Sequence, residues 1–260
     1  MNAQKVSEYI IKWLKDYAEN AGLKGFVVGV SGGIDSAVTS TLCARTGLDL
    51  IGVNMPIYQN ATQFELSSRH ISWLEENFSN VKGMVIDLTL PFKALEDTYP
   101  KEIQDHLTMA NARARLRMTT LYTLAGHHKY LVAGTGNKVE DFGVGFYTKY
   151  GDGGVDLSPI ADLYKTEVWS LGRELGVIED IVKAAPTDGL WDDGRSDEDQ
   201  IGASYPELEW AMEYLRLEKD LEVLEGRQKE VMTLYQRLNR INQHKMQPIP
   251  VCEIPEEVHK

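Results

Sequence analysis

The chain has 260 residues, of which 43% are hydrophobic and 25% charged, which suits one large α/β domain or one domain with a helical extension. Its 27 basic and 39 acidic residues give a net charge of −12, which argues against non-specific binding to nucleic acid or to an anionic membrane. No apolar run could cross a bilayer, and the first 20 residues lack the features of a signal peptide, so we expect a cytoplasmic protein.

Short apolar runs alternate with longer amphipathic segments through the first half of the chain. The pattern predicts helices over residues 3–21, 37–45, 63–78 and 103–125, and strands over residues 26–30, 49–55, 83–87 and 130–133. Short strands that alternate with helices are typical of a parallel sheet covered on both faces. We therefore predict an α/β fold, a doubly wound parallel sheet flanked by helices.

The second half of the chain is expected to complete a single domain spanning residues 1–260. A helix is predicted over residues 162–175, and two further helices over residues 206–240 form a C-terminal extension. Residues 186–203 are rich in Gly and acidic side chains and are predicted to form a lid. Residues 241–260 contain several prolines and are predicted to be an irregular tail.

The glycine-rich loop SGGIDS, residues 31–36, lies between a predicted strand and a predicted helix. The amides of such a loop, together with the hydroxyls of Ser31 and Ser36, can donate to an anion. Asp35 would repel a phosphate unless a cation lies between them, so it suggests Mg²⁺. No Gly-Lys-Ser/Thr follows, which excludes the common P-loop. The alternative is a simple turn in which Asp35 or Ser36 caps the helix.

Two further segments carry candidate charged residues. NARARLRM, residues 111–118, places arginines at positions 113, 115 and 117, which cannot share one helix face. GTGNKVED, residues 134–141, follows the fourth predicted strand, so Thr135 stands at a strand end. Glu140 could complete a Mg²⁺ shell with Asp35, or it could only complement a helix dipole.

Residues 146–169 combine cations, carboxylates and aromatic rings in one glycine-rich segment. Lys149 and Lys165 supply positive charge, whereas Asp152 and Asp156 supply polar anchors. Planar faces for stacking come from Phe146, Tyr147 and Tyr150. Two lysines alone would indicate little, but the combination favours a nucleotide-binding segment.

The order of these motifs resembles that of the NAD⁺ synthetases, a family of the N-type ATP pyrophosphatase superfamily. The matching segments, which cover residues 26 to 245, are SGGIDSA, NARARLRM, GTGNKVED, TKYGDGGVDLSPIADLYKTEV, APTDGLW, DE at 197–198 and QHK near the end. The segment EDFGVGFYTK is one residue longer than the short form of the family. The resemblance implies an adenine nucleotide alpha hydrolase-like fold.

The resemblance also implies a reaction and a set of site residues. ATP adenylates the nicotinate carboxylate of deamido-NAD⁺, and ammonia then displaces AMP to give NAD⁺. The family pattern assigns ATP to Gly29, Val30, Ser31, Gly32, Gly33, Ile34, Asp35, Ser36, Thr135, Lys165 and Thr187, and Mg²⁺ to Asp35 and Glu140. It assigns deamido-NAD⁺ to Arg115, Lys149, Asp156, His244 and Lys245, and the catalytic roles to Asp35, Lys165 and Asp156. Family members are homodimers, so a homodimer is expected.

The nitrogen donor and the general base are less constrained by the residues. Cys43 and Cys252 show no pairing with a histidine, so we expect free ammonia rather than glutamine as donor. Asp152 or Asp156 could assist deprotonation of ammonia, and the sequence does not choose between them.

Other functions would fit part of the pattern. A GMP-synthetase-like enzyme, or another adenylating ligase of the superfamily, would share the loop but lack the TKYGDGG segment. A nucleotide-binding regulator without chemistry would not need both carboxylates and both lysines. A tRNA-modifying role is disfavoured by the net charge of −12 and the lack of a cysteine pair.

Overall fold

The computed structural model describes residues 1–59, 61–184, 186 and 196–259. Its centre is a four-stranded parallel sheet with the order β3-β2-β1-β4. The strands are β1 (Gly25–Gly29), β2 (Asp49–Asn54), β3 (Val81–Val85) and β4 (Leu131–Val132). The predicted doubly wound α/β fold is confirmed. The strand order reverses between β1 and β4, and ligands bind at such a reversal, beyond the carboxyl ends of the strands.

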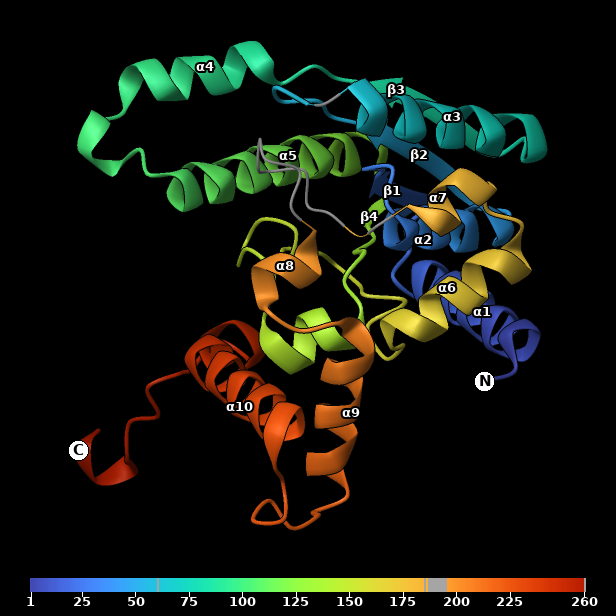
Figure 1. The fold of residues 1–260 in the computed structure, drawn as a ribbon. Coiled ribbons are helices and arrows are strands. Elements are labelled where there is room, and N and C mark those ends of the chain that lie inside the picture. Colours follow the sequence, from blue (N-terminus) through green and yellow to red (C-terminus); the bar gives the residue numbers. More distant parts are fainter. Residues whose placement is uncertain (60, 185, 187–195, 260) are drawn as a thin grey trace.

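Helices bury both faces of the sheet, because successive residues of a strand point to opposite sides. Phe26 and Val28 of β1 pack into one hydrophobic core, whereas Val27 packs into another. The first core is built from α1 (Ala3–Asn20), α2 (Ile34–Arg45), α3 (Ala61–Asn77), α6 (Lys165–Leu175) and α7 (Glu179–Lys183). The second core is covered by α4 (Thr89–Thr98) and α5 (His106–His128) (Figure 1).

Two features of the second face differ from the sequence expectation. Helix α5 begins at His106 rather than at residue 103, because Asp105 is the N-cap and its side chain accepts from the Thr108 amide. Helix α4 was not predicted. Pro91 reads as a helix breaker but lies in the first turn, where proline is tolerated, and Phe92 is the only buried residue of the helix, so its apolar periodicity is weak.

A third core lies in the C-terminal extension. It joins a π-helix, η2 (Val139–Val144), to α9 (Tyr205–Arg216) and α10 (Gly226–Met246), next to the short α8 (Asp197–Ile201). In Figure 1, α9 and α10 extend below the sheet and its covering helices. The remaining elements are two 3₁₀ turns, η1 (Lys101–Ile103) and η3 (Glu256–Val258). No helix among the described residues has the length and apolar character needed to span a membrane.

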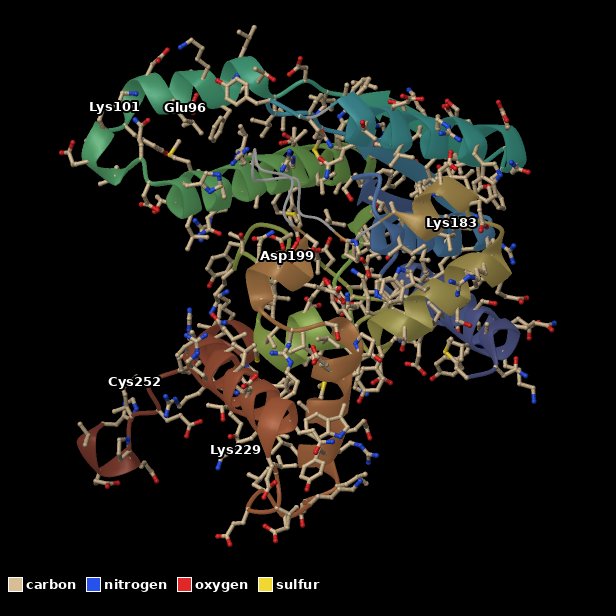
Figure 2. All side chains as sticks on the ribbon, in the orientation of Figure 1. Glu96, Lys101, Lys183, Asp199, Lys229 and Cys252 are labelled. Atoms are coloured by element: carbon tan, nitrogen blue, oxygen red, sulfur yellow. The ribbon has the colours of Figure 1, made fainter. Side chains whose placement is uncertain are left out.

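The irregular tail is shorter than predicted. Helix α10 continues to Met246, so residues 241–246 are helical rather than irregular. The helix ends where Pro248 forces the preceding residue, Gln247, out of the helical region to φ −85° and ψ 150°. The segment after α10 projects from the body of the protein and carries Cys252 (Figure 2).

Candidate active site

A cavity of about 620 Å³ lies at the carboxyl ends of β1, β2 and β4, where the strand order reverses. The loop between β1 and α2 forms one wall, and the residues that follow β4 form the adjacent wall. Helix α5 and residues 144–148 close the cavity from other sides. Residues 29–36, Thr135, Glu140 and Lys165 all line it.

The loop of residues 31–36 is held in shape by its own hydrogen bonds. The Ser36 hydroxyl donates to the Gly33 carbonyl at 3.0 Å and accepts from the Ser31 amide at 3.2 Å. Gly32 has φ +89°, which favours glycine, and a Cβ there would lie 2.9 Å from the Gln63 carbonyl oxygen. Gly33 is the N-cap of α2 and, among the described residues, no side chain caps this helix. The capping alternative for Asp35 and Ser36 is therefore wrong.

Lys165, the first residue of α6, brings two carboxylates together inside the protein. Its Nζ lies 2.6 Å from Oδ2 of Asp35 and 3.1 Å from Oε1 of Glu140. Lys165 is 2% exposed. Burial alone would lower the pKa of its ammonium group, but the carboxylates of Asp35, Glu140 and Asp197 outweigh burial and raise that pKa above its usual value. The lysine therefore carries its charge at neutral pH.

Glu140 lies on the π-helix η2, in the segment that connects β4 to the loop of residues 145–154. A π-helix accommodates one extra residue in a helical turn and often marks a functional site. The Asn137 side-chain oxygen accepts from the amides of Val139 and Glu140 at 3.1 and 3.2 Å, so the start of the turn is satisfied. The Asn137 amide group also donates to Oδ1 of Asp35 at 3.2 Å. The π-helical turn thus holds Glu140 facing Lys165.

The chemistry of these side chains suits a divalent cation bound together with a polyphosphate. Asp35 and Glu140 reach one point from two separate elements, and Lys165 Nζ occupies that point. Hard carboxylate oxygens suit Mg²⁺, which usually takes only one or two carboxylates and completes its shell with phosphate oxygens and water. No cluster of three candidate metal ligands occurs in the described part of the chain.

Arg117 also lines the cavity, although neither its sequence pattern nor the family resemblance assigns it a role. Its Nε donates to the Met55 carbonyl, just after β2, at 3.0 Å. Burial and the nearby Arg113 lower the pKa of Arg117 to about 10. The helical spacing of the sequence could have indicated this position. Residues three or four apart share one face of a helix, and Arg117 is three residues from Ala114, which also lines the cavity.

Comparisons with known proteins agree with this geometry. The model of the NAD synthase family matches residues 6–249. This chain belongs to the NAD synthase family. The NH₃-dependent NAD⁺ synthetase of Carboxydothermus hydrogenoformans is 39% identical, over 98% of each chain.

Two solved structures of the family have a similar fold. An NMN synthetase from Francisella tularensis is 31% identical, with a TM-score of 0.83 over 98% of this chain and 99% of the other. An NH₃-dependent NAD synthetase from Campylobacter jejuni is 26% identical, with a TM-score of 0.79 over 97% of this chain and 100% of the other. Both likenesses extend over nearly the whole chain, including the C-terminal extension.

The cations that the family pattern assigns to the dinucleotide lie where α5 and α10 meet the loop after η2. Arg115 Nε donates to the Lys149 carbonyl at 3.2 Å, and Lys149 Nζ donates to the His244 carbonyl at 2.6 Å. Lys245 Nζ donates to two carbonyls of the segment 145–147 and is the only one of these four residues that lines the cavity. Arg115, Lys149 and His244 instead form a chain of hydrogen bonds from α5 through the loop after η2 to α10.

The two candidate general bases, Asp152 and Asp156, occupy different places. Asp152 lines the cavity, accepts from the Thr148 amide at 3.0 Å, and has a pKa raised above its usual value by burial. Asp156 does not line the cavity. Its oxygens accept from the Tyr122 hydroxyl at 3.0 Å and from the Val132 amide at 2.8 Å, at the edge of the sheet.

Part of the expected site lies outside the described residues. Thr187 lies outside them, as does half of the predicted lid over residues 186–203, namely residues 187–195. The described end of that segment does reach the cavity, because Asp197 and Ile201 of α8 line it.

Proposed function

We propose that this protein amidates deamido-NAD⁺ to NAD⁺, with ammonia as nitrogen donor and with ATP cleaved to AMP and pyrophosphate. The observation that carries the proposal is a single cavity that joins the loop of residues 29–36 to the pair of carboxylates bridged by Lys165. That arrangement occurs in a chain of the NAD synthase family. A GMP-synthetase-like enzyme would lack the TKYGDGG segment, which this chain has at residues 148–154. No observation favours that alternative.

In the first half-reaction, the protein has to hold ATP in line with a weak nucleophile. The amides of residues 31–33 and the N-terminus of α2 would hold the phosphates, and Lys165 would neutralise charge on their oxygens. Mg²⁺, held by Asp35 and Glu140, would supply a further positive charge to the phosphates. The nicotinate carboxylate attacks the α-phosphorus, the bond to the bridging oxygen breaks, and pyrophosphate leaves.

In the second half-reaction, ammonia attacks the acyl carbon of the adenylate. The bond to AMP breaks, and AMP leaves with the bonding electrons as the amide forms. One proton must be lost from nitrogen. Asp152 suits this role better than Asp156, because Asp152 lines the cavity and Asp156 does not.

The remaining expectations concern assembly and access. A homodimer would place the surface formed by Arg115, Lys149 and His244 beside a second chain, which would extend the binding site for a long dinucleotide. Residues 186–203 would close over ATP and limit hydrolysis of the adenylate. The irregular segment after Met246 would contribute to the dinucleotide end, and the enzyme would act in the cytoplasm.

One assay tests the proposal. Purified protein with ATP and Mg²⁺ is given ammonium or glutamine as nitrogen donor, with deamido-NAD⁺ or nicotinate mononucleotide as acceptor. We expect NAD⁺ with ammonium and deamido-NAD⁺, with equal amounts of AMP and pyrophosphate. The mononucleotide is included because one similar structure is that of an NMN synthetase. Faster turnover of the mononucleotide, or pyrophosphate release without either acceptor, would overturn the proposal.

A further inference from the structure

Tyr205, the first residue of α9, contacts both Lys165 and Glu140 without lining the cavity itself. Its hydroxyl donates to Oε1 of Glu140 at 2.5 Å, and its ring lies under Lys165, with Nζ 4.6 Å from the ring centroid. Tyr205 is fully buried, at 0% exposed. One side chain thus contacts both the carboxylate and the ammonium that face the loop of residues 29–36, the proposed nucleotide loop.

The position of the Tyr205 ring is determined by its own surroundings. Ser204 and Glu207 form a capping box at the start of α9, and the Tyr205 amide donates to Oε1 of Glu198 at 2.8 Å. The Trp169 ring lies edge-on at a centroid distance of 6.2 Å. A ring held in this way has little freedom to follow Glu140 or Lys165, so it restricts their motion instead.

Both hydrogen bonds that described residues donate to the Glu140 side chain fall on the same carboxylate oxygen. Lys165 Nζ and the Tyr205 hydroxyl approach Oε1, and no donor from the described residues reaches Oε2. If Lys165 turns towards a bound phosphate, the Tyr205 hydroxyl still holds Oε1 and keeps the carboxylate oriented. Hydrogen bonds of this kind orient metal-ligating carboxylates, and their loss typically weakens metal binding about 10–100-fold.

We propose that Tyr205 is a positioning residue that orients Glu140 for the divalent cation and holds Lys165 beside it. This inference rests on the proposed function, since that function brings the cation with ATP. It also links the segment beyond residue 196 to the phosphate end of the cavity, because α8 and α9 carry Asp197 and Tyr205.

The test measures metal binding without turnover. Mn²⁺ binding is followed by electron paramagnetic resonance in the presence of ATP and the absence of deamido-NAD⁺. Tyr205→Phe keeps the ring and removes only the hydroxyl, so the variant should fold, and we expect Mn²⁺ affinity to fall about tenfold or more. In turnover assays the apparent KM for Mg²⁺ should rise and kcat should recover at saturating Mg²⁺. Unchanged Mn²⁺ affinity in Tyr205→Phe would overturn the inference.

Two controls separate this role from general loss of structure. Tyr164→Phe removes a hydroxyl that also donates to a glutamate, Glu213, but neither residue lines the cavity, so Mn²⁺ affinity should be unchanged. In a Glu140→Gln background, Tyr205→Phe should cause no further loss, because the hydroxyl acts through Glu140. An additive loss in the double variant would overturn the inference. If the wild-type protein binds no Mn²⁺ with ATP, the nucleotide site, and with it the proposed function, fails instead.

Discussion

The ammonium of Lys165 lies 2.6 Å from the carboxylate of Asp35, although 130 residues separate them in the chain. The contact joins the start of α6 to the first turn of α2, which directly follows the loop of residues 31–33. Removal of one partner from a buried ion pair leaves an uncompensated charge, which is far more costly than loss of an exposed pair.

The first prediction concerns the buried charge of Lys165. Lys165→Met should lower the free energy of unfolding by about 3–5 kcal/mol, because Asp35 and Glu140 then face each other without a cation. The control is Lys183→Met, which breaks an exposed pair with Glu179 on α7 (Figure 2) and should cost about 0.5 kcal/mol or less. Urea unfolding measures both. Equal losses would show that the buried network does not stabilise the fold.

The second prediction concerns the backbone of the nucleotide loop. Gly32→Ala places a Cβ at φ +89°, 2.9 Å from a backbone oxygen, so the loop must distort. We expect a stability loss of about 1–3 kcal/mol and loss of ATP binding in calorimetric titration.

Gly22→Ala is the matched control for that change. Gly22 has φ +68°, but no atom lies within 4 Å of an added Cβ, and the residue is far from the cavity. It should lose about 1 kcal/mol of stability and keep wild-type ATP affinity. Wild-type ATP affinity in Gly32→Ala would argue that this loop does not bind the phosphates.

The features of the fold and the site that the sequence could predict are those that depend on residues close together in the chain. The parallel sheet was predictable, because strands buried on both faces read as continuous apolar runs between amphipathic helices. The π-helix was not, because one extra residue in a turn leaves little trace in a periodicity of 3.6. Tyr205 was not either. Its role depends on Glu140, 65 residues earlier, and on packing of α9 against α6 that no local pattern encodes.

The third prediction concerns the pH dependence of stability. His70 is fully buried, its ring bonds to the Ser40 hydroxyl at 3.0 Å, and burial lowers its pKa from 6.5 to about 4. Between those values the unfolded chain binds a proton that the folded protein does not. Stability is therefore complete above pH 6.5 and falls as the pH decreases towards 4, with a contribution of about 3 kcal/mol from this group.

Comparison with His70→Gln isolates that contribution from those of the carboxylates. The variant should be less stable than the wild type at pH 8, because it repacks a buried ring beside Trp73. The difference between the two proteins should shrink as the pH falls from 6.5 to 4, as measured by urea unfolding at each pH. A constant difference would mean that His70 titrates normally in the folded protein.

The last prediction distinguishes two neighbouring arginines of α5. Arg117 lines the cavity, whereas Arg115 lies on another face and donates to the Lys149 carbonyl outside it. A guanidinium that faces a cavity next to the nucleotide loop should bind a substrate anion directly. Arg117→Gln should therefore lower kcat/KM by about 10- to 100-fold, since a charge-assisted hydrogen bond contributes about 1.5–3 kcal/mol.

Arg115→Gln should act differently, because neither Arg115 nor its partner Lys149 lines the cavity. If it binds the dinucleotide as the family pattern implies, the KM for deamido-NAD⁺ should rise while the KM for ATP and kcat stay near wild type.

Arg117→Lys is a further control, since a point charge cannot reproduce the planar fork and should recover only part of the activity. Steady-state kinetics with each substrate varied in turn decides between the two roles. A larger loss of kcat in Arg115→Gln than in Arg117→Gln would reverse the assignment and place the reacting groups nearer the α5–α10 junction.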